Sequence, residues 1–167
     1  AAGIRMAQST SQVSALTADI VPLPVDPSVM RLSADWIRSS ASVQGDLGAF
    51  ETMGGTMLSG ASLEVMGTTI ALSEKPAPNT TVFMGSGIQI VLNEQVVGGN
   101  GVDANAIVVN AVHIRFDHVA TVNGELNGEI VLGHSDASLA AVPEPAGLAT
   151  LLAGLACLAR SRRIRKH

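Results

Sequence analysis

Short apolar runs alternate with polar residues from about Ser11 to Ala140, and glycine, proline, asparagine and aspartate separate the runs. The alternation is clearest at Ile88, Ile90 and Leu92, which we expect to share one buried face of a strand. The pattern predicts strands over Gln12–Ile20, Val29–Ile37, Ser39–Leu47, Met57–Val65, Thr68–Leu72, Gly87–Val96, Ala106–Phe116 and Glu125–Leu132. No ten-residue stretch of this part has a helical period, so the expected fold is all-β, an antiparallel sandwich or a barrel-like sheet.

Three segments interrupt the predicted strands. Prolines in 21–27 and 74–79, and glycines in 98–101, predict loops there. Asn123-Gly124 is the strongest hairpin signal, because both residues tolerate a positive φ, and Asn127-Gly128 competes with it. A two-residue turn at that position pairs residues whose numbers sum to 247, which places His113 opposite His134. A slip of one residue would exchange the two faces.

The residues after 140 follow a different pattern. Four residues that disfavour regular structure are followed by a run without charge over 146–159 and then by a basic segment. The four are Val142, Pro143, Glu144 and Pro145; apolar positions of the run include Ala146, Gly147, Leu148, Leu151, Leu152, Leu155 and Leu158; the basic residues are Arg160, Arg162, Arg163, Arg165 and Lys166. We therefore divide the chain into a β-rich domain (1–140), a linker (141–145) and a hydrophobic helix with a basic tail (146–167).

The apolar run has the length of a short membrane segment. As a helix it spans roughly 21 Å, against about 30 Å for the hydrocarbon core of a bilayer. Arg160 can extend its aliphatic stem along the apolar layer while its guanidinium reaches the interface, and the bilayer can thin locally. The positive-inside bias then predicts a cytoplasmic basic end and an external β-rich domain.

The charge is distributed unevenly along the chain. Five of the ten basic residues lie in the basic segment, whereas all fourteen acidic residues precede it. The part before Arg160 thus has five basic and fourteen acidic side chains, a formal charge of −9. This charge argues against nucleic-acid binding, which requires a basic surface. The single cysteine, Cys157, lies in the apolar run, so we expect no disulfide in the β-rich domain.

The sequence offers few candidates for chemistry. His134 adjoins Ser135 and Asp136, but neighbouring residues of a strand point to opposite faces, so a hydrolase triad is not expected. The segment Gly98–Asp103 resembles the start of a calcium-binding nonapeptide, although Asn105 stands where a large apolar residue is required. His113, His134 and Asp103 are the candidates for a metal site, and a structural role is preferred for each. No cofactor is expected.

The order of Pro143-Glu144-Pro145, apolar run and arginine-rich segment resembles the PEP-CTERM sorting signal of Gram-negative envelope proteins. The resemblance implies an exported protein that resides transiently in the inner membrane. It also implies processing by an exosortase, a membrane-embedded cysteine protease. For the mature protein it implies the cell surface or extracellular matrix, with a link to exopolysaccharide.

The β-rich domain has a resemblance of its own. Gln89–Gln95, Val108–Ile114 and Gly128–Ala137 are similar to the closing half of choice-of-anchor P domains, which carry no established catalytic residues to transfer. The expected function is therefore a non-enzymatic surface or matrix component. The alternative is a secreted binding or hydrolytic module that uses a loop site, with calcium as its candidate ion. Calcium-dependent folding, or activity lost in His134→Ala, would favour the alternative.

Overall fold

The computed structural model describes residues 4–20, 29–46, 48–121 and 124–141, and these residues form antiparallel β-strands joined by turns and loops. The expected all-β antiparallel fold is thus confirmed for this part of the chain. The strands are β1 (Arg5–Ile20), β2 (Met30–Asp46), β3 (Ala49–Ser59), β4 (Ser62–Val65), β5 (Thr68–Ile70), β6 (Thr80–Gly85), β7 (Ile88–Gly99), β8 (Ala104–Thr121) and β9 (Gly124–Ala140).

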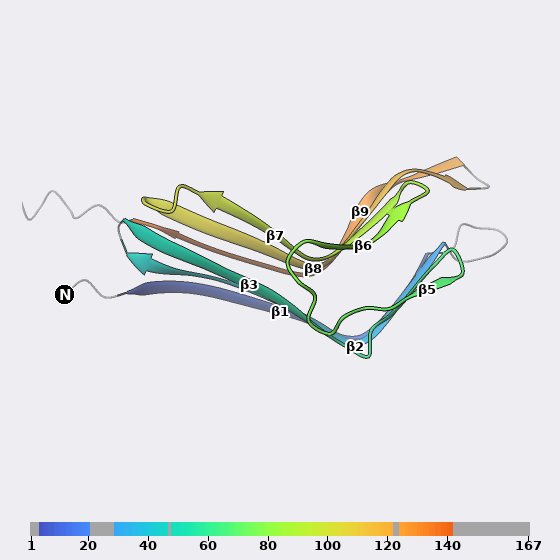
Figure 1. Cartoon of the computed structure of the whole chain (residues 1–167), viewed down its shortest axis with the longest axis horizontal. Coiled ribbons are helices and arrows are strands. Elements are labelled where there is room, and N and C mark those ends of the chain that lie inside the picture. The colour runs from blue at the N-terminus through green and yellow to red at the C-terminus, as the bar shows by residue number, and fades with distance from the viewer. Residues whose placement is uncertain (1–3, 21–28, 47, 122–123, 142–167) are drawn as a thin grey trace, which may run out of the picture.

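The strands form two sheets that stack face to face (Figure 1). In the first sheet β1 pairs with one edge of β2, while β3 and β4 pair with successive parts of its other edge and β5 follows β4. The second sheet has the order β6-β7-β8-β9. The arrangement is sandwich-like, with the apolar faces of the two sheets turned toward each other.

Several predicted strand boundaries differ from those observed. The segments predicted separately at 29–37 and 39–47 are joined in the single strand β2 (Met30–Asp46), because only Arg38 lies between them and no glycine or proline breaks the strand there. The segment 57–65, predicted as one strand, is divided at Gly60, whose φ is +58°. Strand β6 was not predicted. The break expected at 74–79 is confirmed, since these residues lie between β5 and β6.

Both sheets bend along one line (Figure 1). In the first sheet the bend passes Ala15 and Gly60, and in the second it passes Asn93 and Gly133; all four have φ between +51° and +62°. A left-handed residue interrupts the alternation of side chains along a strand and changes its direction. Because the four positions lie beside one another in the two sheets, the strands turn together. The second sheet lies on the inner side of the bend, so its outer face is concave.

The core has a separate apolar cluster in each arm of the bent sandwich. The larger cluster includes Met30, Ile90 and Ile114, and the smaller includes Val43 and Val109. All five side chains are fully buried. The predicted burial of Ile88, Ile90 and Leu92 on one face is confirmed, with exposures of 1%, 0% and 1%.

The predicted hairpin register is wrong. Thr121 pairs with Gly124, whereas the expected register pairs it with Leu126; residues 122–123 lie outside the described residues. A bulge between Phe116 and Val119 then shifts the register again, and His113 pairs with Val131. The bulge is held by the Oδ1 atom of Asn127, which accepts a hydrogen bond of 2.8 Å from the backbone N–H of His118. His113 and His134 are therefore not opposite each other.

Candidate functional site

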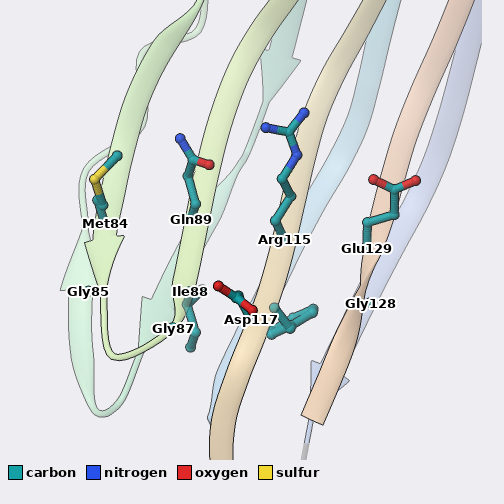
Figure 2. Close-up of a pocket in the computed structure, with 10 residues that line it drawn as sticks. Met84, Gly85, Gly87, Ile88, Gln89, Arg115, Asp117, Gly128 and Glu129 are labelled. Atoms are coloured by element: carbon teal, nitrogen blue, oxygen red, sulfur yellow. The ribbon is translucent and has the colours of Figure 1, made fainter.

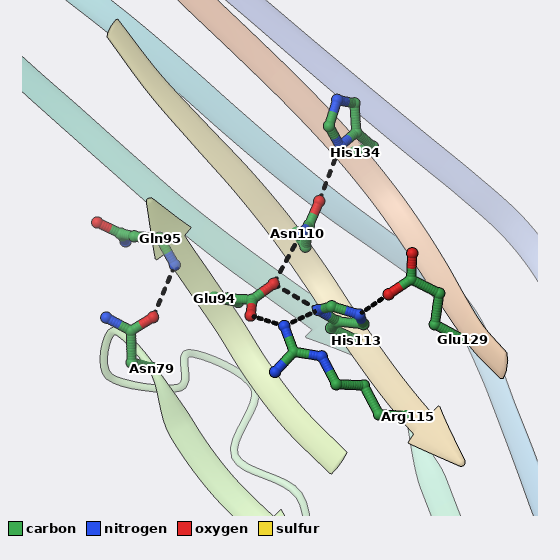
Figure 3. A network of polar contacts seen from close by, with 8 residues as sticks. All are labelled: Asn79, Glu94, Gln95, Asn110, His113, Arg115, Glu129 and His134. Atoms are coloured by element: carbon green, nitrogen blue, oxygen red, sulfur yellow. Dashed lines mark hydrogen bonds and ion pairs between the residues drawn. The ribbon is translucent and has the colours of Figure 1, made fainter. Parts of the chain in front are cut away.

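A polar network occupies the concave outer face of the second sheet (Figure 3). The bend determines which residues belong to it, since Asn110 and His113 are three positions apart and would point to opposite faces of a regular strand. Asn93 and Gly133, with positive φ, flank Ala111 on the neighbouring strands. The alternation shifts there, so Ala111 and Val112 are both buried while Asn110 and His113 both reach the outer face. The His113 network comprises Glu94, Asn110, His113, Arg115, Glu129 and His134.

His113 lies at the centre of this network, between two carboxylates. Its Nδ1 atom is 2.6 Å from Oε2 of Glu94, and its Nε2 atom is 3.0 Å from Oε2 of Glu129. Carboxylates only accept hydrogen bonds, and an imidazole carries hydrogens on both nitrogens only in its cationic form. Each ring nitrogen of His113 thus lies within hydrogen-bonding distance of a carboxylate oxygen, and Nδ1 also lies 3.4 Å from Nη2 of Arg115. The imidazole is 7% exposed and the Glu94 side chain 14%, so the contact between these two groups is largely sheltered from solvent.

Glu94, on β7, contacts three side chains of the neighbouring strand β8. Its Oε2 atom also accepts a 2.8 Å hydrogen bond from Nδ2 of Asn110, and its Oε1 atom accepts a 3.0 Å bond from Nη2 of Arg115. Asn110 in turn accepts a 2.8 Å hydrogen bond at Oδ1 from Nδ1 of His134. The network thus extends from β7 across β8 to β9 (Figure 3).

The surroundings of Glu94 favour its charged form. Burial by itself raises the pKa of a carboxyl group, but the bonds from Asn110 and His113 and the positive charges of His113 and Arg115 together outweigh burial. The net effect is a pKa of Glu94 below its ordinary value of 4.5. Glu94 is therefore a structural anion that holds the network together.

A shallow hollow of about 640 Å³ adjoins the network on the same face (Figure 2). One side is a cross-strand row formed by Met84, Gln89, Arg115 and Glu129, and the other side includes Asp117. We call this feature the Arg115 hollow. The hollow shares Arg115 and Glu129 with the network, so the contact of Arg115 with Glu94 and that of Glu129 with His113 position two of its polar side chains.

The structure separates the residues of the imagined hydrolase triad. Ser135 is buried between the sheets, where its Oγ lies 2.6 Å from Oγ of Ser39. His134 instead contacts Asn110 on the outer face. The predicted opposite orientation of the two neighbours is confirmed. The contact of His134 with Asp136 is long, at 4.0 Å, and both side chains are largely exposed.

The loop around Asp103 uses its oxygens to close on itself. Oδ1 of Asn100 accepts hydrogen bonds from the backbone N–H groups of Val102, Asp103 and Ala104, at 2.9, 2.8 and 3.3 Å. The Asp103 carboxylate accepts a further bond of 3.1 Å from Nδ2 of Asn100. Turn closure accounts for both side chains. Within the described part of the chain, no three His, Cys, Asp or Glu residues are grouped so that they could hold a metal ion.

The predicted sorting motif, membrane segment and basic anchor, residues 142–167, lie outside the described residues, and so does the predicted C-terminal helix. In the described ranges, no helix has the length and apolar character needed to cross a membrane. Comparison of the chain with protein-family models, with curated proteins and with solved structures finds no match.

His113 and His134 were candidates from the sequence, whereas Glu94, Arg115 and Glu129 were not. Glu94 follows the strongly apolar run 88–92 of a strand expected to be central, and a charge in that position was the available signal. The partners of Glu94 depend on the strand register and on the bend, which local sequence patterns do not reveal.

Proposed function

We propose that this chain is an exported, non-enzymatic protein of the bacterial surface or extracellular matrix, processed by an exosortase. The observation that carries the proposal is the order of three sequence features: Pro143-Glu144-Pro145, the uncharged run 146–159 and the basic segment from Arg160 to Lys166. Each feature alone is common, whereas the ordered combination resembles the PEP-CTERM signal. The inner membrane is then a transient location, and exopolysaccharide of the matrix is the environment of the mature protein.

Features of the β-rich domain support a non-enzymatic role. Ser135 is turned into the sandwich and bonded to Ser39, away from His134. His113 is occupied at both ring nitrogens by Glu94 and Glu129. These contacts stabilise a sheet face and leave no arranged pair of nucleophile and base among these residues. The acidic domain also suits an exported protein that stays soluble after its release.

The test is the intact mass of the protein recovered from the envelope and medium of a Gram-negative host that has an exosortase. We expect a mature form that ends close to Pro145 and lacks the basic segment. A strain without the exosortase should retain the full tail, and so should a variant with alanine at positions 143–145. A surface form that keeps Arg162 to His167 at normal exosortase levels would contradict the proposal and indicate a simple tail anchor.

A further inference from the structure

The Arg115 hollow is an open surface formed by the backbone of the second sheet. Ile88 and Phe116 lie at its base, and both turn their side chains into the core, with exposures of 1% and 6%. Gly85 and Gly128 flank them in the same cross-strand row and have no side chain. The outer surface above this row is therefore bare backbone. The volume of the Arg115 hollow, about 640 Å³, lies within the range of small-molecule sites, roughly 300–1,000 Å³.

The polar groups beside the hollow are held in place but keep unused bonding capacity. Nη2 of Arg115 is bonded to Glu94, and the side chain is still 50% exposed. Glu129 uses one carboxylate oxygen for His113 and is 65% exposed. In the described part of the chain, no side-chain hydrogen bond occupies the amide of Gln89. A ligand would thus meet prearranged donors and acceptors (Figure 2).

The mixture of charges at the hollow disfavours a ligand that carries a single net charge. A simple anion would be attracted by Arg115 but repelled by Glu129 and by Asp117, which is 83% exposed. A simple cation would meet the opposite conflict, and a wholly apolar ligand would remove these groups from water without replacing their hydrogen bonds. A hydroxyl group both donates and accepts, so a molecule rich in hydroxyls satisfies Arg115 and Glu129 together.

From these observations we infer that the Arg115 hollow is a binding site for a neutral saccharide. The hydroxyls of the sugar would bond Arg115, Glu129 and Gln89, while Met84, which is 70% exposed, covers the apolar C–H face of the ring. The bare backbone of the row Gly85, Ile88, Phe116 and Gly128 allows the ring to approach closely. The inference deepens the proposed matrix role and rests on it for the source of the saccharide, although the binding itself requires only the folded β-rich domain.

The experiment is a titration of the full chain, purified in detergent, with neutral oligosaccharides of glucose, galactose, mannose and N-acetylglucosamine, followed by backbone amide NMR. We expect at least one oligosaccharide to shift the amides of Gly85, Ile88 and Gly128. Gln89→Ala should weaken its binding about fivefold, the value of one neutral hydrogen bond, and Glu129→Gln about tenfold or more. Gln8→Ala is the matched control, because this exposed glutamine lies on the outer face of the other sheet.

The outcomes are distinguishable. Unchanged melting temperatures of the variants would assign the loss to the ligand. The inference is overturned if no oligosaccharide shifts these amides, if sodium acetate shifts them and the oligosaccharides do not, or if Gln8→Ala weakens binding as much as Gln89→Ala. A protein that binds a saccharide but keeps its basic tail on the surface would contradict only the sorting proposal. A correctly processed protein that binds none would contradict only this inference.

Discussion

At the scale of single residues, the charged carboxylate of Glu94 stabilises the polar network on the concave face. The fold lowers the pKa of Glu94 below 4.5, so the ionised carboxylate is more stable in the folded than in the unfolded chain. This contribution to stability is present above pH 4.5 and is lost as the pH falls through the folded pKa. We therefore expect the free energy of unfolding to decrease on acidification below about pH 4.5.

Glu94→Gln should lower the free energy of unfolding at pH 7 by about 1–3 kcal/mol, because it removes the charged partner of His113 and Arg115. The decrease below pH 4.5 should also become smaller in this variant. Urea unfolding at several pH values measures both effects. Glu74→Gln is the control, since Glu74 is exposed in a loop. Equal losses in the two variants, or an unchanged acid limb in Glu94→Gln, would contradict the assignment.

The hydrogen bond between Ser39 and Ser135 is a second contribution of single residues to stability. The two hydroxyls lie 2.6 Å apart between the sheets, and both residues are almost fully buried. Ser135→Ala should cost about 1–3 kcal/mol because the Ser39 hydroxyl loses its partner. The double variant Ser39→Ala/Ser135→Ala should cost clearly less than the two single changes together, since no hydroxyl is then left unpaired. Additive losses in thermal unfolding would show that the hydroxyls act independently.

At the scale of strands, the bend is the feature that creates the candidate site. Gly133 has a φ of +62°, and an added Cβ would lie 2.9 Å from Cβ of Ala111 and 3.4 Å from Cγ2 of Ile37. Gly133→Ala should therefore destabilise the protein by about 2–3 kcal/mol, from left-handed strain and the close contact. Gly98→Ala should change the stability by less than about 0.5 kcal/mol, because nothing lies within 4 Å of the added atom.

Melting temperatures of Gly133→Ala and Gly98→Ala compare their stabilities. The NMR signals of the His113 ring report whether its contacts in the network have changed. If Gly133→Ala melted like the wild type while the His113 signals stayed unchanged, the bend would not require a glycine at this position. A shift of the His113 signals together with a lower melting temperature would link the bend to the network.

The pairing of the strands explains which features could be predicted from the sequence. Burial of Ile88, Ile90 and Leu92 follows from local alternation, so it was predicted correctly. The pairing of His113 depends on the bulge between Phe116 and Val119, and its position beside Asn110 depends on the backbone of Gly133. Such left-handed positions are determined by contacts between strands far apart in the sequence. The type of fold was therefore accessible from the sequence, whereas the composition of the network was not.

At the scale of the whole molecule, the chain combines two regions with opposite charge. The part before Arg160 has a formal charge of −9, and the basic segment carries five positive side chains within residues 160–166. The concave network lies wholly in the acidic part and brings together β7, β8 and β9. The proposed processing would separate the two regions, so that the released domain keeps its fold and its site.

The last prediction concerns the basic segment. Under the sorting proposal these side chains hold the preceding apolar run in the inner membrane, because each would cost roughly 2.5–3.5 kcal/mol at the bilayer centre. Replacing Arg160, Arg162, Arg163, Arg165 and Lys166 by glutamine should therefore cause mis-sorting and loss of the processed form. Cys157→Ala is the control and should leave sorting unchanged, because alanine suits the apolar run equally well. Fractionation of the host, with intact masses from each fraction, measures the outcome. Normal processing of the glutamine variant would show that the positive charges are not the retention signal.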